Sequence, residues 1–221
     1  MLTDRFVKAV DYARVVHAGV TRKSTSIPYL AHVLAVSALV LEHGGSEDQA
    51  IAALLHDAAE DGGGQVRLDD IRVEFGPAVA GMVEACSDSL VADPNQKESW
   101  WVRKVRYLGG LEHEPPDAAL ISAADKLHNA SAVLMDYRRV GEDLWSRFNA
   151  DAGRAGALWY YRSMAEVLSR RLRGAGAGPA ALADELTRTV AELLAAVGAV
   201  VGADVLETDW RASCQRADCL R

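Results

Sequence analysis

Histidine and aspartate side chains recur in three short, otherwise apolar segments of the chain. The first segment carries His32, the second carries the neighbours His56 and Asp57, and the third carries Asp125. Imidazole nitrogens and carboxylate oxygens bind divalent cations, and such a cation can acidify water and polarise a phosphoryl oxygen. The sequence therefore predicts that these four residues bind one metal ion and that the protein hydrolyses a phosphate ester.

A second acidic pair, Glu60 and Asp61, follows closely after the central His-Asp pair. His56 and Glu60 are four positions apart, as are Asp57 and Asp61, so a helix would stack each pair along its surface. The capping pattern at Ser46 predicts that this helix begins at about Glu47 and continues to the glycines at 62–64. We expect Glu60 and Asp61 to be catalytic, orienting the attacking water and moving a proton.

The predicted ligands would come from three separate helices, which would hold the site in a helical bundle. Two imidazoles and two carboxylates suit six-coordinate Mn²⁺ or Fe²⁺, with Mg²⁺, Zn²⁺ and Co²⁺ as alternatives. A single histidine on an apolar face is usually a packed core residue, and a His-Asp pair at a helix end can complement the helix dipole. The metal interpretation therefore depends on the three segments together.

Composition limits the classes of function. The chain has 221 residues, half of them hydrophobic, and a formal charge of −7, which argues against a surface that coats nucleic acid. Three cysteines do not indicate a disulfide framework. The N-terminal residues lack an apolar signal region, and the apolar run near 193–201 is too short for a membrane span. We expect a cytoplasmic protein that can act on a small anionic substrate and has neither nucleic acid nor a membrane as its partner.

Apolar residues recur at helical spacing nearly throughout, so the predicted fold is all-α, a multi-helix bundle with a C-terminal helical extension. We expect residues 1–173 to form the main domain. Residues 174–221 should comprise a Gly/Ala linker at 174–179, a helix at 182–201 and a polar tail. The other helices are expected at 6–19, 28–44, 68–75, 77–88, 97–108, 118–137 and 154–172.

At these residues the sequence resembles the HD superfamily of metal-dependent phosphohydrolases, and within it the small alarmone hydrolases of the RelA/SpoT type. The resemblance covers about residues 6–172. The matching segments are Arg22-Lys23 before Pro28-Tyr29 and His32, His56-Asp57-x-x-Glu60-Asp61, Phe75-Gly76 with the helix after it, Lys104, and Asp125-Lys126-Leu127-His128-Asn129.

The resemblance implies an HD-domain bundle that hydrolyses the 3′-pyrophosphate of ppGpp or pppGpp, releasing pyrophosphate and GDP or GTP. His32, His56, Asp57 and Asp125 match the ligands of a bound Mn²⁺, and Glu60 and Asp61 match the catalytic pair. The matches for substrate contacts are Arg22 and Lys23 at the base and phosphate, Lys104 and Asn129 near the phosphates and ribose, and Tyr160 at the sugar or phosphate.

The sequence also departs from the family pattern. Two residues after Asn129 the family usually has an arginine, whereas this chain has Ala130-Ser131-Ala132. Less positive charge there would weaken nucleotide binding or change the preferred substrate. Three alternatives therefore stay open: hydrolysis of an adenine alarmone such as ppApp, hydrolysis of NADPH, and a non-catalytic module that binds alarmone. The segment from Gly174 onward matches nothing in the family, and its helix could pack on the domain, cover the site or build a homo-oligomer.

Overall fold

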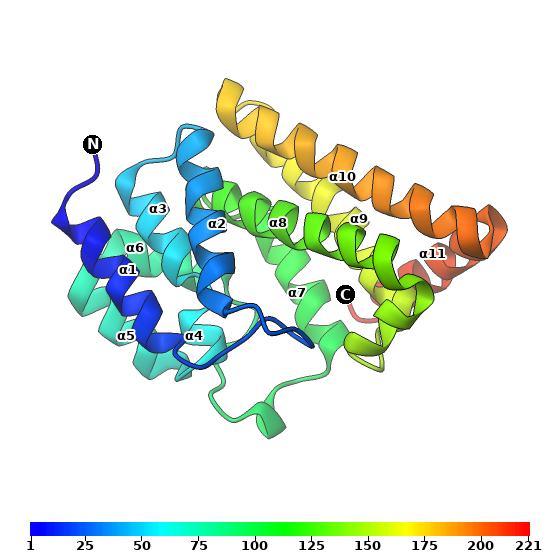
Figure 1. The fold of residues 1–221 in the computed structure, drawn as a ribbon, viewed down its shortest axis with the longest axis horizontal. Coiled ribbons are helices and arrows are strands. Elements are labelled where there is room, and N and C mark those ends of the chain that lie inside the picture. The colour runs from blue at the N-terminus through cyan, green and yellow to red at the C-terminus, as the bar shows by residue number, and fades with distance from the viewer.

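The computed structural model describes all 221 residues except the side chain of Pro94. Within that description the chain is helical and the structure has no strand, which confirms the all-α prediction (Figure 1). The helices are α1 (Asp4–Val16), α2 (Tyr29–Glu42), α3 (Glu47–Leu55), α4 (Ala58–Asp61), α5 (Gly64–Phe75), α6 (Pro77–Cys86), α7 (Trp100–Leu111), α8 (Pro116–Val140), α9 (Gly153–Leu172), α10 (Ala177–Val201) and α11 (Ala203–Asp218), with 3₁₀ segments η1 (Pro94–Gln96) and η2 (Gly141–Arg147).

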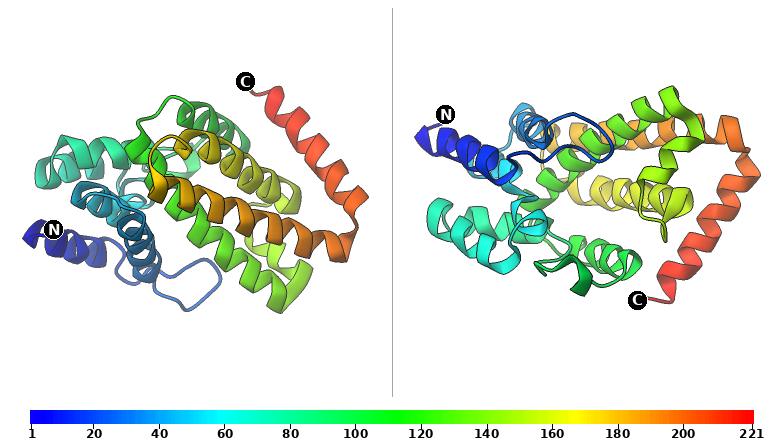
Figure 2. Two further views of the ribbon diagram at one scale, coloured as in Figure 1. Left: turned by 90° about the horizontal axis from the view of Figure 1, so that it is seen from above. Right: turned by 60° about the horizontal axis from the view of Figure 1, so that its bottom comes forward.

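The long helix α8 joins the two ends of the molecule. Helices α1 to α6 gather at one end, while α9, α10 and α11 lie at the other (Figures 1 and 2). Helix α8 packs against α2 and α3 on the first side and against α9, α10 and η2 on the second. Residues on α8 can therefore face both halves of the chain.

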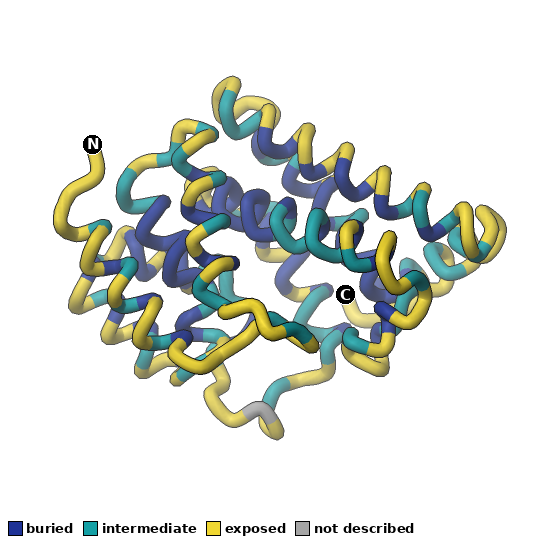
Figure 3. Tube along the Cα trace, viewed as in Figure 1, coloured by how far each residue is buried: buried dark blue, intermediate teal, exposed yellow. Residues whose placement is uncertain are grey.

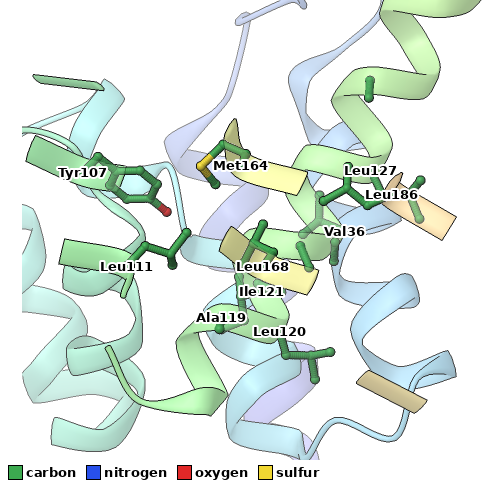
Figure 4. Packing of buried hydrophobic residues seen from close by; sticks show 14 of the residues in the cluster. Val36, Tyr107, Leu111, Ala119, Leu120, Ile121, Leu127, Met164, Leu168 and Leu186 are labelled. Atoms are coloured by element: carbon green, nitrogen blue, oxygen red, sulfur yellow. The ribbon is translucent and has the colours of Figure 1, made fainter. Parts of the chain in front are cut away.

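Buried residues follow the inner faces of these helices (Figure 3). Their apolar side chains form one continuous core. Figure 4 shows Met164 and Leu168 of α9 beside Ile121 of α8, between Leu111 of α7 and Leu186 of α10. All five side chains are completely excluded from solvent. Burial of this kind contributes roughly 1.5–3 kcal/mol per large apolar side chain, so the core fixes the relative positions of the helices that carry polar residues.

The central helix predicted from Glu47 to the glycines is interrupted, so that prediction was wrong in part. The capping box at Ser46 forms as expected, but α3 ends at Leu55 and a new helix, α4, begins at Ala58. Asp57 lies between them with φ −96° and ψ −5°. This sparsely populated backbone region is common among active-site residues, and here it turns Asp57 toward His56.

The C-terminal segment also differs from its prediction. The expected linker at 174–179 is shorter, because α10 already begins at Ala177, and the expected tail forms α11. A side chain at Gly178 would place its Cβ 2.3 Å from the carbonyl oxygen of His43, so α10 starts in close contact with the end of α2. Helix α7 likewise continues through Gly109 and Gly110, where an end was expected, because Leu111 beyond them is completely buried.

Helix α11 turns back along the molecule and is tied to two segments that follow α8. Arg154 of α9 bridges Asp209 of α11, at 2.9 Å, and Glu142 of η2, at 2.7 Å. Arg216 of α11 binds both carboxylate oxygens of Asp151 at 2.8 Å. These contacts connect the last helix to η2 and to the segment that leads into α9.

None of the described helices is, by itself, both long and apolar enough to cross a membrane. Helices α10 and α11 meet the test only as a pair, with a bend of 119° between them. The inner face of α10 is occupied by the core, because Leu182, Leu186 and Leu193 are completely buried there.

Candidate active site

Two buried imidazoles are oriented in the same way. His56 donates its Nδ1 proton to the carbonyl oxygen of Ala53 at 2.8 Å. His32 Nδ1 lies 2.9 Å from Nδ1 of His128, which also accepts a hydrogen bond from Arg22 at 3.0 Å. Since His128 is the acceptor, His32 is the donor. Both His32 and His56 therefore use Nδ1 as a donor and direct Nε2, the atom that would bind a metal, into the cluster.

The two Nε2 atoms are buried and, among the described residues, have no hydrogen-bond partner. Instead they face two carboxylates. His56 Nε2 lies 2.9 Å from Asp57 Oδ2, and His32 Nε2 lies 3.2 Å from Asp125 Oδ1. The two cross distances, from His32 to Asp57 and from His56 to Asp125, are both 3.7 Å. His32, His56 and Asp57 each offer a ligand atom within 4.8 Å of the other two. Ligands at right angles around a cation with bonds near 2.1 Å stand about 3 Å apart, so these three residues can hold one divalent cation, and Asp125 Oδ1 beside His32 is the candidate fourth ligand.

The charges of this cluster are strongly coupled. Burial disfavours an imidazolium, but Asp57 and Asp125 together outweigh it and raise the pKa of His56 well above its usual value. Burial also opposes ionisation of Asp57 and Asp125, yet the pKa of each carboxyl group is held well below its usual value. The main opposing cause is the charge of His56 for Asp57 and the charge of Lys126 for Asp125. The carboxylates therefore stay ionised and require a positive charge between them, which a metal ion would supply.

Glu60 and Asp61 lie beside this cluster, on α4. Burial, then the charge of Asp88, raises the pKa of Glu60 to about 7. Burial, then the charge of Asp57, raises the pKa of Asp61 to about 6. Both carboxyl groups therefore titrate close to neutral pH, as groups that exchange protons with a substrate must.

Asp88 organises the surroundings of Glu60, and sequence analysis gave it no role. Its backbone N–H donates to Glu60 Oε2 at 3.1 Å, and its side chain, 2% exposed, pairs with Arg103 and with Lys104 at 2.6 Å. The segment carrying Asp88 passes close to Gly64, where φ is +57° and an added Cβ would lie 2.2 Å from the carbonyl oxygen of Leu90. Gly64 thus allows the close approach that brings Asp88 to Glu60.

These groups line a small polar cavity of about 180 Å³, which we call the inner cavity. Its acidic side holds Asp57, Asp125, Glu60 and Asp61. Its basic side holds the buried cations Lys104 and Lys126, whose Nζ atoms lie 5.0 and 5.7 Å from the ring centre of Tyr160. The hydroxyl of Tyr160 is buried and has no partner among the described residues. The basic side therefore offers three donors to an anion.

A larger cavity of about 530 Å³, the outer cavity, adjoins the inner one. Asn129 lines both: it donates to Asp125 Oδ1 at 2.6 Å and accepts from Arg22 at 2.9 Å. The outer cavity is bordered by cationic and aromatic side chains, which suit phosphate and an aromatic ring. These are Arg22, Lys23, Arg139, Arg147, Trp100, Phe148 and Tyr161.

Comparison with known proteins identifies the scaffold. The HD domain family matches residues 9–158. This chain belongs to the HD domain family. Human MESH1, named guanosine-3′,5′-bis(diphosphate) 3′-pyrophosphohydrolase, is 30% identical over 145 residues, which cover 64% of this chain and 74% of MESH1. A GTP pyrophosphokinase of Streptomyces antibioticus is 34% identical over 122 residues, 55% of this chain but only 14% of that enzyme.

Two solved structures share the HD domain architecture. The structure of a metazoan SpoT orthologue, described as hydrolysing ppGpp and acting in starvation responses, matches with a TM-score of 0.62 and 27% identity, covering 85% of this chain and 96% of that one. A protein of Listeria monocytogenes matches with a TM-score of 0.61 and 28% identity, covering 76% and 99%. The resemblance predicted from the sequence is thereby confirmed.

The structure brings the residues predicted from the sequence together in two groups. The predicted ligands and the pair Glu60 and Asp61 meet at the inner cavity, where Lys104 and Tyr160 also lie. Arg22 and Lys23 face the outer cavity, and Asn129 lies between the two. The break between α3 and α4 means that His56 and Glu60 do not lie on one continuous helix, as the predicted stacking of His56 on Glu60 required.

Several polar residues of the HD domain site had no role in the sequence analysis. Tyr29 donates to Asp57 Oδ2, and Lys126 pairs with Asp125. Both belong to quoted motifs, so their positions in these motifs could have indicated a role. Asp88 stands at the end of the segment quoted after Phe75-Gly76, although no role was given to it. Arg103 belonged to no quoted motif, and the two residues reach Glu60 from a loop and from α7.

Proposed function

We propose that this HD domain protein hydrolyses the 3′-pyrophosphate of ppGpp and pppGpp, releasing pyrophosphate and GDP or GTP. The observation that carries the proposal is the pair of unpartnered Nε2 atoms facing two carboxylates, next to an acidic pair and two buried lysines in one cavity. MESH1 is named for this reaction, and the metazoan SpoT orthologue is described as hydrolysing ppGpp.

His32, His56, Asp57 and Asp125 would hold the metal ion. Two nitrogen and two oxygen donors suit Mn²⁺ with two further positions open, which makes Mn²⁺ our choice over Fe²⁺, Mg²⁺, Zn²⁺ and Co²⁺. When bound, the cation lowers the pKa of water and polarises a phosphoryl oxygen.

The reaction adds water to the phosphorus atom attached to O3′ and breaks that P–O3′ bond. The water must lose a proton and O3′ must gain one. Glu60 and Asp61 titrate near neutrality beside the ligands and are the groups that exchange these protons. Asp88 fixes Glu60 by its backbone N–H, so the carboxyl group meets the substrate in one orientation.

Lys104, Lys126 and the Tyr160 hydroxyl would bind the pyrophosphate that leaves. The two lysines are already desolvated, so their attraction to phosphate oxygens is stronger than that of exposed lysines. Arg22 and Lys23 would hold the nucleoside in the outer cavity, with Asn129 at the ribose between the two cavities.

The test is a hydrolysis screen of purified protein against ppGpp, pppGpp, ppApp and NADPH, with each candidate metal and with products separated by chromatography. We expect GDP or GTP plus pyrophosphate, fastest with Mn²⁺. Turnover of ppApp or NADPH alone would support the metal site but show that ppGpp is not the substrate. Turnover of none of the four would contradict the proposal.

A binding module without turnover is tested by Glu60→Gln and Asp61→Asn, which keep the size of each side chain. Each should lower kcat by about 10²- to 10⁴-fold while ppGpp still binds. Glu84→Gln, on the exposed face of α6, is the matched control and should leave kcat unchanged. Equal rates for all three variants would contradict a catalytic role for the pair.

A further inference from the structure

One face of α8 runs from the metal ligands to the far end of the outer cavity. Asp125, Asn129 and Asp136 stand at positions i, i+4 and i+11, which bring them to the same side of a helix. With a rise of 1.5 Å per residue, Asp125 and Asp136 are separated by about 16 Å along the axis. A nucleotide whose 3′-pyrophosphate lies in the inner cavity could extend along this face, past Asn129, so that the edge of its base points toward Asp136.

The middle of this face is flat. Ala132 and Val133 line the outer cavity between Asn129 and Asp136 and leave room above the helix. Aromatic side chains border the same space, and flat rings of this kind stack on nucleobases. The outer cavity thus has the shape and chemistry to hold a base whose edge points along α8.

Asp136 is the acidic residue among the described residues that line the outer cavity. Arg147 of η2 donates to Asp136 Oδ2 at 2.9 Å, and both side chains are largely buried, 29% and 26% exposed. Arg139, which is 78% exposed, lies 3.7 Å from Oδ1. A carboxylate has about four acceptor sites, so Asp136 retains capacity after Arg147 is bound, and Arg147 fixes its orientation.

We propose that Asp136, oriented by Arg147, reads the base and selects guanine over adenine. Guanine presents two donors side by side, N1–H and the 2-amino group, whereas adenine presents a lone pair at N1 and no donor at C2. A carboxylate only accepts hydrogen bonds, so it attracts the guanine edge and repels N1 of adenine. This specificity role rests on the function proposed above.

The expected preference for guanine over adenine can be estimated from bidentate contacts between side chains and bases in other proteins. A good bidentate hydrogen-bonded contact to a base discriminates by about 1–3 kcal/mol, or roughly 5- to 150-fold. The carboxylate also repels the wrong base, so the preference should lie at the upper part of that range. Asparagine, which can donate as well as accept, should remove most of it.

The experiment measures kcat and KM for ppGpp and ppApp, with Mn²⁺, for the wild-type protein, Asp136→Asn and Asp136→Ala. Asp143→Asn is the matched control, because Asp143 is an exposed acid on η2 outside the cavity. In the wild type we expect a preference for ppGpp of at least 10-fold in kcat/KM. Asp136→Asn should reduce that ratio by about 10-fold or more, through a higher KM for ppGpp with kcat nearly unchanged, while Asp143→Asn keeps it.

The outcomes separate this proposal from the hydrolase itself. If the wild type hydrolyses ppGpp and Asp136→Asn leaves the ratio unchanged, the base-reading role is wrong and the hydrolase stands. A wild-type preference for ppApp would also overturn it. If neither alarmone is hydrolysed, both proposals fail. Retained or improved ppApp turnover by Asp136→Asn would show that the variant is folded and that the loss is specific to guanine.

Discussion

The inner and outer cavities share Asn129 but differ in the parts of the chain that surround them. The inner cavity takes its ligands from α2, α8 and the junction of α3 and α4, which meet in the buried core. The outer cavity is bordered on one side by the loop after α1 and on the other by η2 and the segment after it. The proposed metal ligands are therefore on helices or at a helix junction inside the core, whereas much of the proposed nucleoside site is on connecting segments.

The comparison shows how chemistry and selectivity can be separated in one molecule. Metal ligands must be held within a fraction of an ångström, which packed helices achieve. A base pocket must bind one nucleotide in preference to others. When loops and a 3₁₀ segment form the pocket, substitution of a few side chains can change this preference. Variants of the inner cavity should therefore affect metal binding and kcat, and variants of the outer cavity should affect KM.

The largest effect is expected for Asp57→Ala at the inner cavity. The change removes one ionised carboxylate from the buried donor set, so metal affinity and turnover should fall together, turnover by about 10³-fold or more. Elemental analysis of the purified variant and the hydrolysis assay measure the two effects. Asp70→Ala, an exposed acid on α5, is the control. A variant that kept a full complement of Mn²⁺ would show that Asp57 is not a ligand.

The next effect concerns the pH dependence of stability in the metal-free protein. The folded-state pKa of Glu60 is raised to about 7, so between pH 4.5 and 7 the folded state binds more protons than the unfolded state and loses stability as pH rises. Glu60→Gln removes this loss. Relative to the wild type, the free energy of unfolding of the variant should therefore increase by about 3 kcal/mol between pH 4 and pH 8.

Urea unfolding of both chelator-treated proteins at the two pH values measures this change. Glu84→Gln provides the baseline for an exposed glutamate, and its difference from the wild type should stay constant with pH. The same constant difference for Glu60→Gln would show that Glu60 ionises normally in the folded protein.

At the outer cavity, Arg22→Ala should raise KM for ppGpp by about 10-fold and lower kcat less. Arg22 binds Asn129 and His128 and faces the cavity, so its loss weakens the nucleoside site. Arg14→Ala, on the exposed face of α1, is the control for lost positive charge. An unchanged KM would show that Arg22 does not contact the nucleoside. A fall mainly in kcat would show that Arg22 acts on the proposed metal site, through its contact with His128.

The smallest effect is expected for Arg216→Ala in α11. Arg216 holds Asp151 and lies 4.9 Å from the ring centre of Trp101, so its loss loosens the segment next to the outer cavity. KM should rise about 2- to 5-fold with kcat unchanged, and the free energy of unfolding should fall by about 1 kcal/mol. Arg211→Ala removes an exposed i,i+4 pair from the same helix and should change neither quantity.

The two cavities also differ in how far sequence could predict them. The four proposed ligands stand in short motifs on separate helices, so residue type and apolar flanks were enough to select them. The wall of the outer cavity is assembled from residues such as Trp100, Asp136 and Arg147, which are far apart and carry no shared pattern. Their proximity results from tertiary packing, which a single sequence does not display.

Errors in the helix boundaries had similar causes. Gly109 and Gly110 were expected to end a helix, but burial of Leu111 outweighs their low helix propensity. Gly178 and Pro179 were expected to form a linker, yet both lie in the first turn of α10, where proline is tolerated and a close contact with α2 requires glycine. The turn at Asp57 could not be predicted because nothing in its local sequence breaks a helix.

The 119° bend between α10 and α11 has a consequence for how this protein can change over time. Because α11 reaches η2 and the segment before α9 without touching the proposed metal ligands, we expect substitutions at those contacts, such as Arg216, to change binding at the proposed nucleoside site and to leave bond cleavage intact. If so, the preferred nucleotide could shift by small steps in the last helix while the proposed metal site stays unchanged.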